Sequence, residues 1–218
     1  MTSHNDSKSV LEVFPSGPFE TNAYLLGCSQ KKIGVFIDPA PESHVNLINA
    51  AKKHQLKIDS IFLTHSHWDH IGDVAILKKE LELKLFVHPL DADNMKTPGS
   101  DGLPLMFPID GAEPDQFFEE GQNLMVGKLK LEVIHTPGHT PGGVSFYLPQ
   151  EKILISGDTL FKGSIGNLSF PTADPAAMWE SLKKLAKLPS ETKVYPGHGP
   201  ATTIGAENWL TKAEEIFS

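Results

Sequence analysis

The chain has 218 residues, of which 39% are hydrophobic and 21% charged, and its formal net charge is −8 at pH 7. This composition is typical of a globular protein with a sizeable core and argues against a nucleic-acid partner, because such binders gather Lys and Arg on one face. The single cysteine, Cys28, excludes an internal disulfide framework, and no run approaches the roughly 18 to 20 apolar residues of a membrane span, so we expect a cytoplasmic protein.

The first half of the chain is predicted to alternate strands and helices after a loose tail over residues 1–10. Short apolar runs bounded by Gly, Pro and Ser predict strands at 11–14, 22–27, 34–39, 58–64 and 83–89.

The spacing of apolar residues predicts two helices in this half. One covers 41–54, with Val45, Ile48 and Ala51 on its buried face. The other runs from Asp69 into the low 80s, and its buried face consists of Val74, Leu77 and Leu81.

Residues 97–116 are rich in Pro, Gly and Asp and predict a long irregular connection. Loops of this length are uncommon without a functional reason. Its apolar side chains would either cover a substrate or cap the core, and both interpretations stay open: Leu103, Leu105, Met106 and Phe107.

The second half is predicted to add strands at 128–134, 144–149, 152–156 and 192–196. Asp174 followed by Pro175 is typical of a helix start, and the helix would bury Met178, Leu182 and Leu185. A last helix has an apolar face to which Ile216 could belong, formed by Trp209, Leu210, Ala213 and Phe217. We expect one domain over 11–218.

Four groups of His and Asp each follow an apolar strand run: HSHWDH at 65–70, HTPGH at 135–139, GD at 157–158 and PGH at 196–198. Strand ends that meet at one edge of a sheet carry functional groups in many α/β folds. The recurrence therefore predicts one pocket lined by His65, His67, Asp69, His70, His139, Asp158 and His198.

Five imidazoles and two carboxylates are more ligands than one tetrahedral ion needs, so this set predicts two divalent metal ions. Nitrogen and oxygen ligands suit zinc, which we expect, or iron or manganese. No cysteine lies in these motifs, which favours a catalytic over a structural site. Each motif alone could be a solvated turn. His135 remains an alternative to His139 as a metal ligand, although His88 and His135 fit hydrogen-bonded positions better than ligand positions.

The motif H-x-H-x-D-H at His65 to His70, followed by His139, Asp158 and His198, resembles that of the metallo-β-lactamase superfamily. The resemblance covers nearly the whole chain and implies an α/β fold, an αββα sandwich with metals at one edge.

The resemblance also implies a role for each ligand. His65, His67 and His139 would hold one metal, Asp69, His70 and His198 the other, and Asp158 would bridge the two. Asp38 resembles an aspartate that orients a ligand histidine through a hydrogen bond.

Within the superfamily, SGDTLFKGSIG and YPGHGPATTIG are similar to short glyoxalase II-like proteins, the hydroxyacylglutathione hydrolases. This likeness implies that a metal-bridging hydroxide cleaves a small-molecule thioester, with Asp69 and Asp158 as catalytic carboxylates. The sequence shows no general acid outside the ligand set, which favours a thiolate leaving group over an amine.

Three alternatives remain. One is an iron-dependent persulfide dioxygenase, and another a hydrolase of a different ester, lactone or lactam, although zinc β-lactamases have Cys or Ser in place of Asp158. The third is a non-catalytic metal-binding module.

Glutathione is expected to bind weakly. Many short relatives carry a basic residue where this chain has Asn167, and Lys162 would compensate only if it contacts the substrate. Because only 20 residues follow His198, we expect no C-terminal glutathione-binding domain. The oligomeric state is not predicted.

Overall fold

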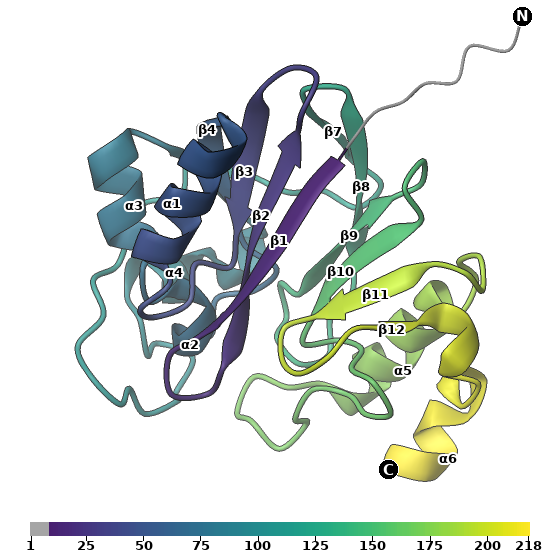
Figure 1. The fold of residues 1–218 in the computed structure, drawn as a ribbon. Coiled ribbons are helices and arrows are strands. Elements are labelled where there is room, and N and C mark those ends of the chain that lie inside the picture. Colours follow the sequence, from purple (N-terminus) through teal and green to yellow (C-terminus); the bar gives the residue numbers. More distant parts are fainter. Residues whose placement is uncertain (1–8) are drawn as a thin grey trace, which may run out of the picture.

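Two β-sheets lie face to face at the centre of the computed structural model, which describes residues 9–218 (Figure 1). The first sheet has the strand order β1-β2-β3-β4-β5-β6. Its strands are β1 (Ser9–Ser16), β2 (Thr21–Cys28), β3 (Ile33–Ile37), β4 (Lys57–Phe62), β5 (Lys84–Val87) and β6 (Gln116–Phe117).

The second sheet has the order β12-β11-β10-β9-β8-β7. Its strands are β7 (Asn123–Val126), β8 (Leu129–His135), β9 (Val144–Leu148), β10 (Ile153–Gly157), β11 (Lys193–Pro196) and β12 (Thr202–Thr203). In the first sheet β3 to β6 are parallel, and in the second β10 and β11 are parallel. The carboxyl ends of β4, β10 and β11 therefore carry three of the four predicted motifs.

Helices cover the outer face of each sheet. The α-helices are α1 (His44–His54), α2 (Trp68–Ile71), α3 (Val74–Leu81), α4 (Ala92–Lys96), α5 (Pro175–Leu185) and α6 (Ala213–Phe217). Three short 3₁₀ turns are η1 (Pro89–Asp91), η2 (Ile204–Ala206) and η3 (Leu210–Lys212). Residues of α1, α3 and α4 pack on the first sheet, and residues of α5, η3 and α6 pack on the second. The predicted αββα sandwich is confirmed.

The main core lies between the sheets. It combines residues from both, such as Leu26 and Ile37 with Val133 and Ile155, and Phe62 makes edge contacts at its centre. All eight residues of β2 are buried, since β2 is covered on one face by the other sheet and on the other by α1. This closed core holds the strand ends in fixed relative positions.

The first predicted helix begins later than expected, and its buried face differs. α1 starts at His44, and its buried residues are Leu47, Ala50 and Ala51. Val45 is 54% exposed, so its assignment to the core was wrong. A regular apolar spacing shows that a helix is amphipathic, but the neighbouring sheet decides which of two adjacent faces is buried.

The second predicted helix is divided into α2 and α3. The break lies at Gly72 and Asp73, where a Cβ on Gly72 would come within 2.4 Å of the Pro41 side chain. This close approach of the chain explains the glycine. Val74 and Leu77 are buried as predicted, whereas Leu81 in the last turn is 38% exposed.

The chain ends also differ from the prediction. Ser9 and Val10 pair with Cys28 and Gly27 in β1, so the predicted tail over 1–10 extends two residues too far. The rest of that tail lies outside the described residues. At the other end Trp209 packs on Phe217 with ring centroids 5.0 Å apart, but Ile216 is 55% exposed and does not join this face.

The second half begins with a strand that the apolar pattern did not predict, β7, and the long connection ends in the two-residue strand β6. Both pair with neighbouring strands at a sheet edge and bury little, so their hydrophobic signal is weak. Within residues 9–218, no helix combines the length and apolar character needed to cross a bilayer.

Candidate metal centre

Four segments bring the predicted site residues to one edge of the sandwich. The loop after β4 carries His65 to His70, the β8–β9 loop carries His139, and Asp158 and His198 follow β10 and β11. The first loop belongs to one sheet and the other three segments to the second. The site therefore lies where the two sheets meet, and it depends on their packing.

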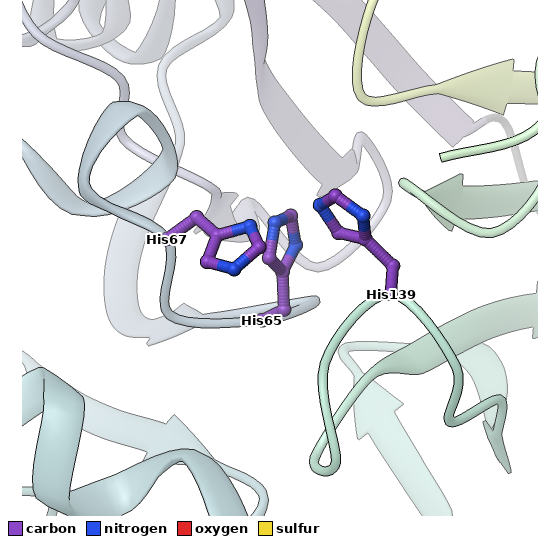
Figure 2. Close-up of side chains that lie close together, drawn as sticks. All are labelled: His65, His67 and His139. Carbon is purple, nitrogen blue, oxygen red and sulfur yellow. The ribbon is translucent and has the colours of Figure 1, made fainter. Parts of the chain in front are cut away.

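His65, His67 and His139 form a three-histidine group with ligand nitrogens within 4.8 Å of one another. Their ring centroids are 4.8 Å apart for His65 and His67, and 4.5 Å apart for His67 and His139. Figure 2 shows the rings of His65 and His67 leaving one loop and that of His139 reaching toward them from another. All three side chains are buried.

Asp69, His70 and His198 form a second group on the same distance criterion. Nε2 of His198 lies 3.2 Å from Oδ2 of Asp69, and Nε2 of His70 lies 3.6 Å from the same oxygen. Thr21 donates a hydrogen bond of 2.7 Å to this Oδ2 and holds the carboxylate in place.

Asp158 lies between the two groups. Its Oδ1 is 3.3 Å from Nε2 of His70, and its Oδ2 is 3.4 Å from Nε2 of His139 and 3.5 Å from Nε2 of His198. A Cβ on Gly197 would be 2.0 Å from Oδ1, so the residue before His198 leaves room for this carboxylate only as glycine. Asp158 thus faces histidines of both groups.

Several of these atoms are buried without a hydrogen bond. Among the described residues, the Nε2 atoms of His65, His67 and His70 and Oδ1 of Asp158 make no hydrogen bond, although Nε2 of His70 faces Oδ1 of Asp158. Burying a polar group without a partner is costly. Ligation of divalent ions would satisfy all four atoms at once, and imidazole and carboxylate are suitable ligands. The residues present therefore fit a two-metal site.

The other ring nitrogens are held by neighbouring groups. Nδ1 of His70 lies 3.0 Å from Oδ2 of Asp38, and Nδ1 of His139 lies 2.9 Å from the carbonyl oxygen of Asn167. Nδ1 of His198 lies 3.1 Å from the Phe19 carbonyl oxygen. Acceptors of this kind set the tautomer and direct Nε2 at a metal. Asp38 is thus the acceptor behind Nδ1 of His70.

Burial and charge set the ionisation of the site. Burial lowers the pKa of His65 well below its ordinary value and that of His67 to about 3. Burial opposes ionisation of the carboxylates, but His70 and His198 outweigh it and lower the pKa of Asp69 to about 2 and that of Asp158 well below its usual range.

His70 and His198 behave in the opposite way. Burial acts to lower the pKa of both, but the facing carboxylates outweigh it: Asp158 and Asp69 raise the pKa of His198 to about 9 and that of His70 well above its ordinary value. At neutral pH both carboxylates are charged and His65 and His67 are neutral, as metal binding requires, whereas His70 and His198 must each lose a proton to become ligands.

His135 lies away from both groups. Its ring stacks on that of His88 with centroids 4.2 Å apart and planes 10° apart, and its Nε2 lies 3.0 Å from the Pro141 carbonyl oxygen. The structure thus places His139, and not His135, in the three-histidine group.

The two candidate substrate-binding residues are exposed. The Asn167 side-chain oxygen accepts a hydrogen bond of 2.8 Å from the backbone N–H of Ser169, while the backbone carbonyl oxygen of Asn167 holds His139. Lys162 follows Phe161, whose ring centroid is 6.0 Å from that of His198. Both residues lie on the segment that borders the site.

The long connection also reaches the site. Phe107 lies edge-on to Trp68 with centroids 5.6 Å apart, and Trp68 is the residue between His67 and Asp69. Oδ2 of Asp101 is 3.9 Å from Nε2 of His67. Asp101, Thr21 and Asp91, which contacts the loop after His65, were not predicted as site residues. No local motif marks them, because each acts across a long sequence separation.

Comparisons with family models, sequences and solved structures all point to one protein family. A sequence model of the Metallo-beta-lactamase superfamily matches residues 16–198. The chain is 32% identical to the hydroxyacylglutathione hydrolase GloC of Haemophilus influenzae over 90% of this chain and 94% of that protein.

Two solved structures are also similar. The structure described as BLEG-1 B3 metallo-beta-lactamase has a TM-score of 0.84 and 36% identity, covering 93% of this chain and 100% of that one. TTHA1623, solved in a di-iron-bound form, has a TM-score of 0.76 and 40% identity, covering 90% of this chain and 96% of that one.

Proposed function

Because the chain belongs to the metallo-beta-lactamase superfamily, we propose that it is a dinuclear metal-dependent hydrolase that cleaves a thioester of the hydroxyacylglutathione class. The observation that carries this proposal is the position of Asp158, with one oxygen 3.3 Å from Nε2 of His70 and the other 3.4 Å from Nε2 of His139. A carboxylate placed between two histidine groups is suited to bridging two ions.

We assign one metal to His65, His67 and His139, the other to Asp69, His70 and His198, and a bridging role to Asp158. Zinc is the ion we propose first, and iron or manganese suits the same ligands. The similar structure TTHA1623, which was solved with two irons, supports a site for two ions in this chain. The iron itself is a property of that protein.

A bound divalent ion would supply Lewis acidity and lower the pKa of a coordinated water to about 7. The residues of the chain supply orientation and charge. Thr21 holds Asp69 through its hydroxyl, Asp38 holds His70, and Gly197 leaves room for Asp158. Rigid support of this kind keeps reacting groups in a productive geometry.

The ionisation of the carboxylates favours a thioester over an amide. Because the pKa of Asp69 is lowered to about 2 and that of Asp158 well below its usual range, neither side chain carries a proton at neutral pH. A thiol with a pKa of about 8.5 can leave as the thiolate, whereas an amine needs a proton donor. Asp69 therefore has no proton to donate to an amine leaving group.

A second candidate function is hydrolysis of a β-lactam, because one similar structure is described as a metallo-beta-lactamase. The leaving group of a β-lactam is an amine, which needs a proton donor, and neither Asp69 nor Asp158 can supply a proton at neutral pH. The persulfide dioxygenase alternative requires a single iron, and the second group of Asp69, His70 and His198 would then have no metal to bind.

The test is turnover by metal-loaded protein of a lactoylglutathione-type thioester, a simple thioester, a β-lactam and a glutathione persulfide. We expect thiol release from thioesters with two metals per chain. Oxygen uptake with the persulfide at one iron per chain would support the dioxygenase instead. Faster opening of the lactam than of any thioester would overturn the proposed leaving group.

A further inference from the structure

We propose that Asp91 is a positioning residue that holds together the two loops of the three-histidine group. This inference rests on the metal ligands assigned above, and it adds a residue that has no part in ligation. Asp91 ends η1 and is only 3% exposed, although its side chain is a carboxylate.

The Asp91 carboxylate accepts hydrogen bonds from both loops. Oδ2 accepts from the backbone N–H of Ser66 at 2.9 Å and from the Thr140 hydroxyl at 3.0 Å. Oδ1 accepts from the backbone N–H of Gly142 at 2.7 Å. Three donors to one buried carboxylate offset part of the cost of its burial and make strong, directional contacts.

The bonded residues are neighbours of the ligands. Ser66 lies between His65 and His67, and Thr140 directly follows His139. The loop of His65 and His67 extends from the first sheet, while the loop of His139 joins β8 to β9 in the second. Asp91 therefore links the two backbone segments whose separation determines whether three imidazoles can converge on one ion.

The surrounding chain is shaped around this carboxylate. A Cβ on Gly142 would lie 2.4 Å from Oδ1 of Asp91, so the loop approaches at a distance that only glycine permits. Asn94, one turn farther along, donates to the Ser66 carbonyl oxygen at 2.6 Å. Both the N–H and the C=O of Ser66 are thus bound by residues 91–94.

The second metal group has separate supports. Asp69 is held by Thr21, His70 by Asp38 and His198 by the Phe19 carbonyl oxygen. Loss of the Asp91 contacts should therefore weaken the three-histidine site selectively. A residue that only stabilises the fold would affect the two sites equally.

The experiment measures the affinity of each site by itself. His198→Ala leaves the three-histidine group intact, and His67→Ala leaves the group of Asp69, His70 and His198 intact. Asp91→Asn is added to each background, and Zn²⁺ affinity is measured by competition with a chromophoric chelator. Asp93→Asn is the matched control, since it makes the same change two residues away on a side chain that is 96% exposed.

In the His198→Ala background, Asp91→Asn should weaken Zn²⁺ binding about 10- to 100-fold, as loss of a hydrogen-bond partner behind metal ligands does. In the His67→Ala background, Asp91→Asn should change the Zn²⁺ affinity by less than about threefold, which is well below that 10- to 100-fold range. The Co²⁺ absorption spectrum should change only in the first background, and Asp93→Asn should change neither.

Equal losses in both backgrounds, or none in the first, would overturn the proposal. If Asp91→Asn does not fold, Thr140→Val decides, because it removes one hydrogen bond and should weaken the three-histidine site about two- to tenfold. An unchanged affinity there would also overturn it. A background that binds no metal before Asp91 is changed would instead refute the ligand assignment, and the present proposal with it.

Discussion

Nδ1 of His70 and Oδ2 of Asp38 lie 3.0 Å apart, both completely buried, at the junction of the β3 and β4 strand ends. The same carboxylate accepts hydrogen bonds from the backbone N–H of Thr64 at 2.7 Å and from its hydroxyl. Asp38 has a φ of 48°, an uncommon value for a residue other than glycine. Its backbone strain is offset by these three contacts, which direct the other ring nitrogen of His70 toward Asp69 and Asp158.

Asp38→Asn should weaken the metal site of Asp69, His70 and His198 about 10- to 100-fold, the range found when a partner behind a ligand histidine is lost. The amide NH₂ of Asn would face the Thr64 N–H and hydroxyl or the His70 ring, which all donate to this side chain, so one of these hydrogen bonds would be lost. Chelator competition in the His67→Ala background measures this effect, with Asp59→Asn on the exposed side of β4 as the control. Unchanged affinity in Asp38→Asn would show that His70 is oriented by other contacts.

Asp158→Ala should remove more metal than the loss of any single histidine, because it takes a ligand from both ions and leaves their mutual repulsion unscreened. Gly197→Ala should reproduce much of this loss without changing a ligand, since its Cβ would lie 2.0 Å from Oδ1 of Asp158. Elemental analysis after reconstitution gives the metal content per chain. Two tightly bound metals in Asp158→Ala would refute the bridging assignment.

His139→Ala should abolish binding at the three-histidine site, whereas His135→Ala should keep it. The reason is geometric: Nε2 of His139 lies 3.4 Å from Oδ2 of Asp158, while His135 stacks on His88 and bonds the Pro141 carbonyl oxygen. His135→Ala serves as the matched control, and it should lower the melting temperature instead. The reverse pattern of metal loss would mean that the two histidines were assigned backwards.

The sandwich was expected from the resemblance of the ligand motifs to those of the metallo-β-lactamase superfamily, whereas the place of the site was predicted from strong local signals. A strand is an apolar run, and each ligand motif directly follows one, so the parallel arrangement of β10 and β11 brings Asp158 and His198 side by side. The Pro137-Gly138 turn directly before His139 is a further local feature that favours His139 over His135 as a ligand.

The parts that were not predicted depend on contacts between distant residues. Asp91 acts on Ser66, Thr140 and Gly142, which are 25 to 51 positions away. In the sequence it is only an aspartate two residues after Pro89. The face of α1 was misassigned for a similar reason, because burial of Leu47 in place of Val45 is decided by the sheet against which the helix packs.

Metal binding should release protons at neutral pH and become tighter as the pH rises toward about 9. Burial acts to lower the pKa of His198, but hydrogen bonds to Asp158 and Asp69 outweigh it and raise the value to about 9. The metal-free site therefore carries a proton on His198 below that pH, and a metal must displace it. Calorimetry at pH 7.5 in buffers of different ionisation enthalpy should show this release, and His198→Ala should reduce it. Binding enthalpies that do not depend on the buffer would contradict it.

Asn167 bears on recognition of the glutathione part of the proposed substrate. Asn167 is exposed beside the site, and its side-chain oxygen accepts a hydrogen bond from the Ser169 backbone. Because its amide is neutral, it offers no positive charge to a carboxylate of glutathione. A charge-assisted hydrogen bond from Arg contributes roughly 1.5 to 3 kcal/mol, which corresponds to about 10- to 100-fold in affinity.

Asn167→Arg should therefore lower KM for a lactoylglutathione-type thioester by up to that factor and leave KM for a simple thioester unchanged. Asn167→Gln is the control, because it lengthens the side chain without adding charge and keeps the carbonyl oxygen that holds His139. Equal changes for both thioesters would indicate a shift of His139 instead of recognition. A wild-type enzyme that already saturates at low concentrations of the glutathione thioester, and is weakened by Lys162→Ala, would show that Lys162 supplies the charge that Asn167 lacks.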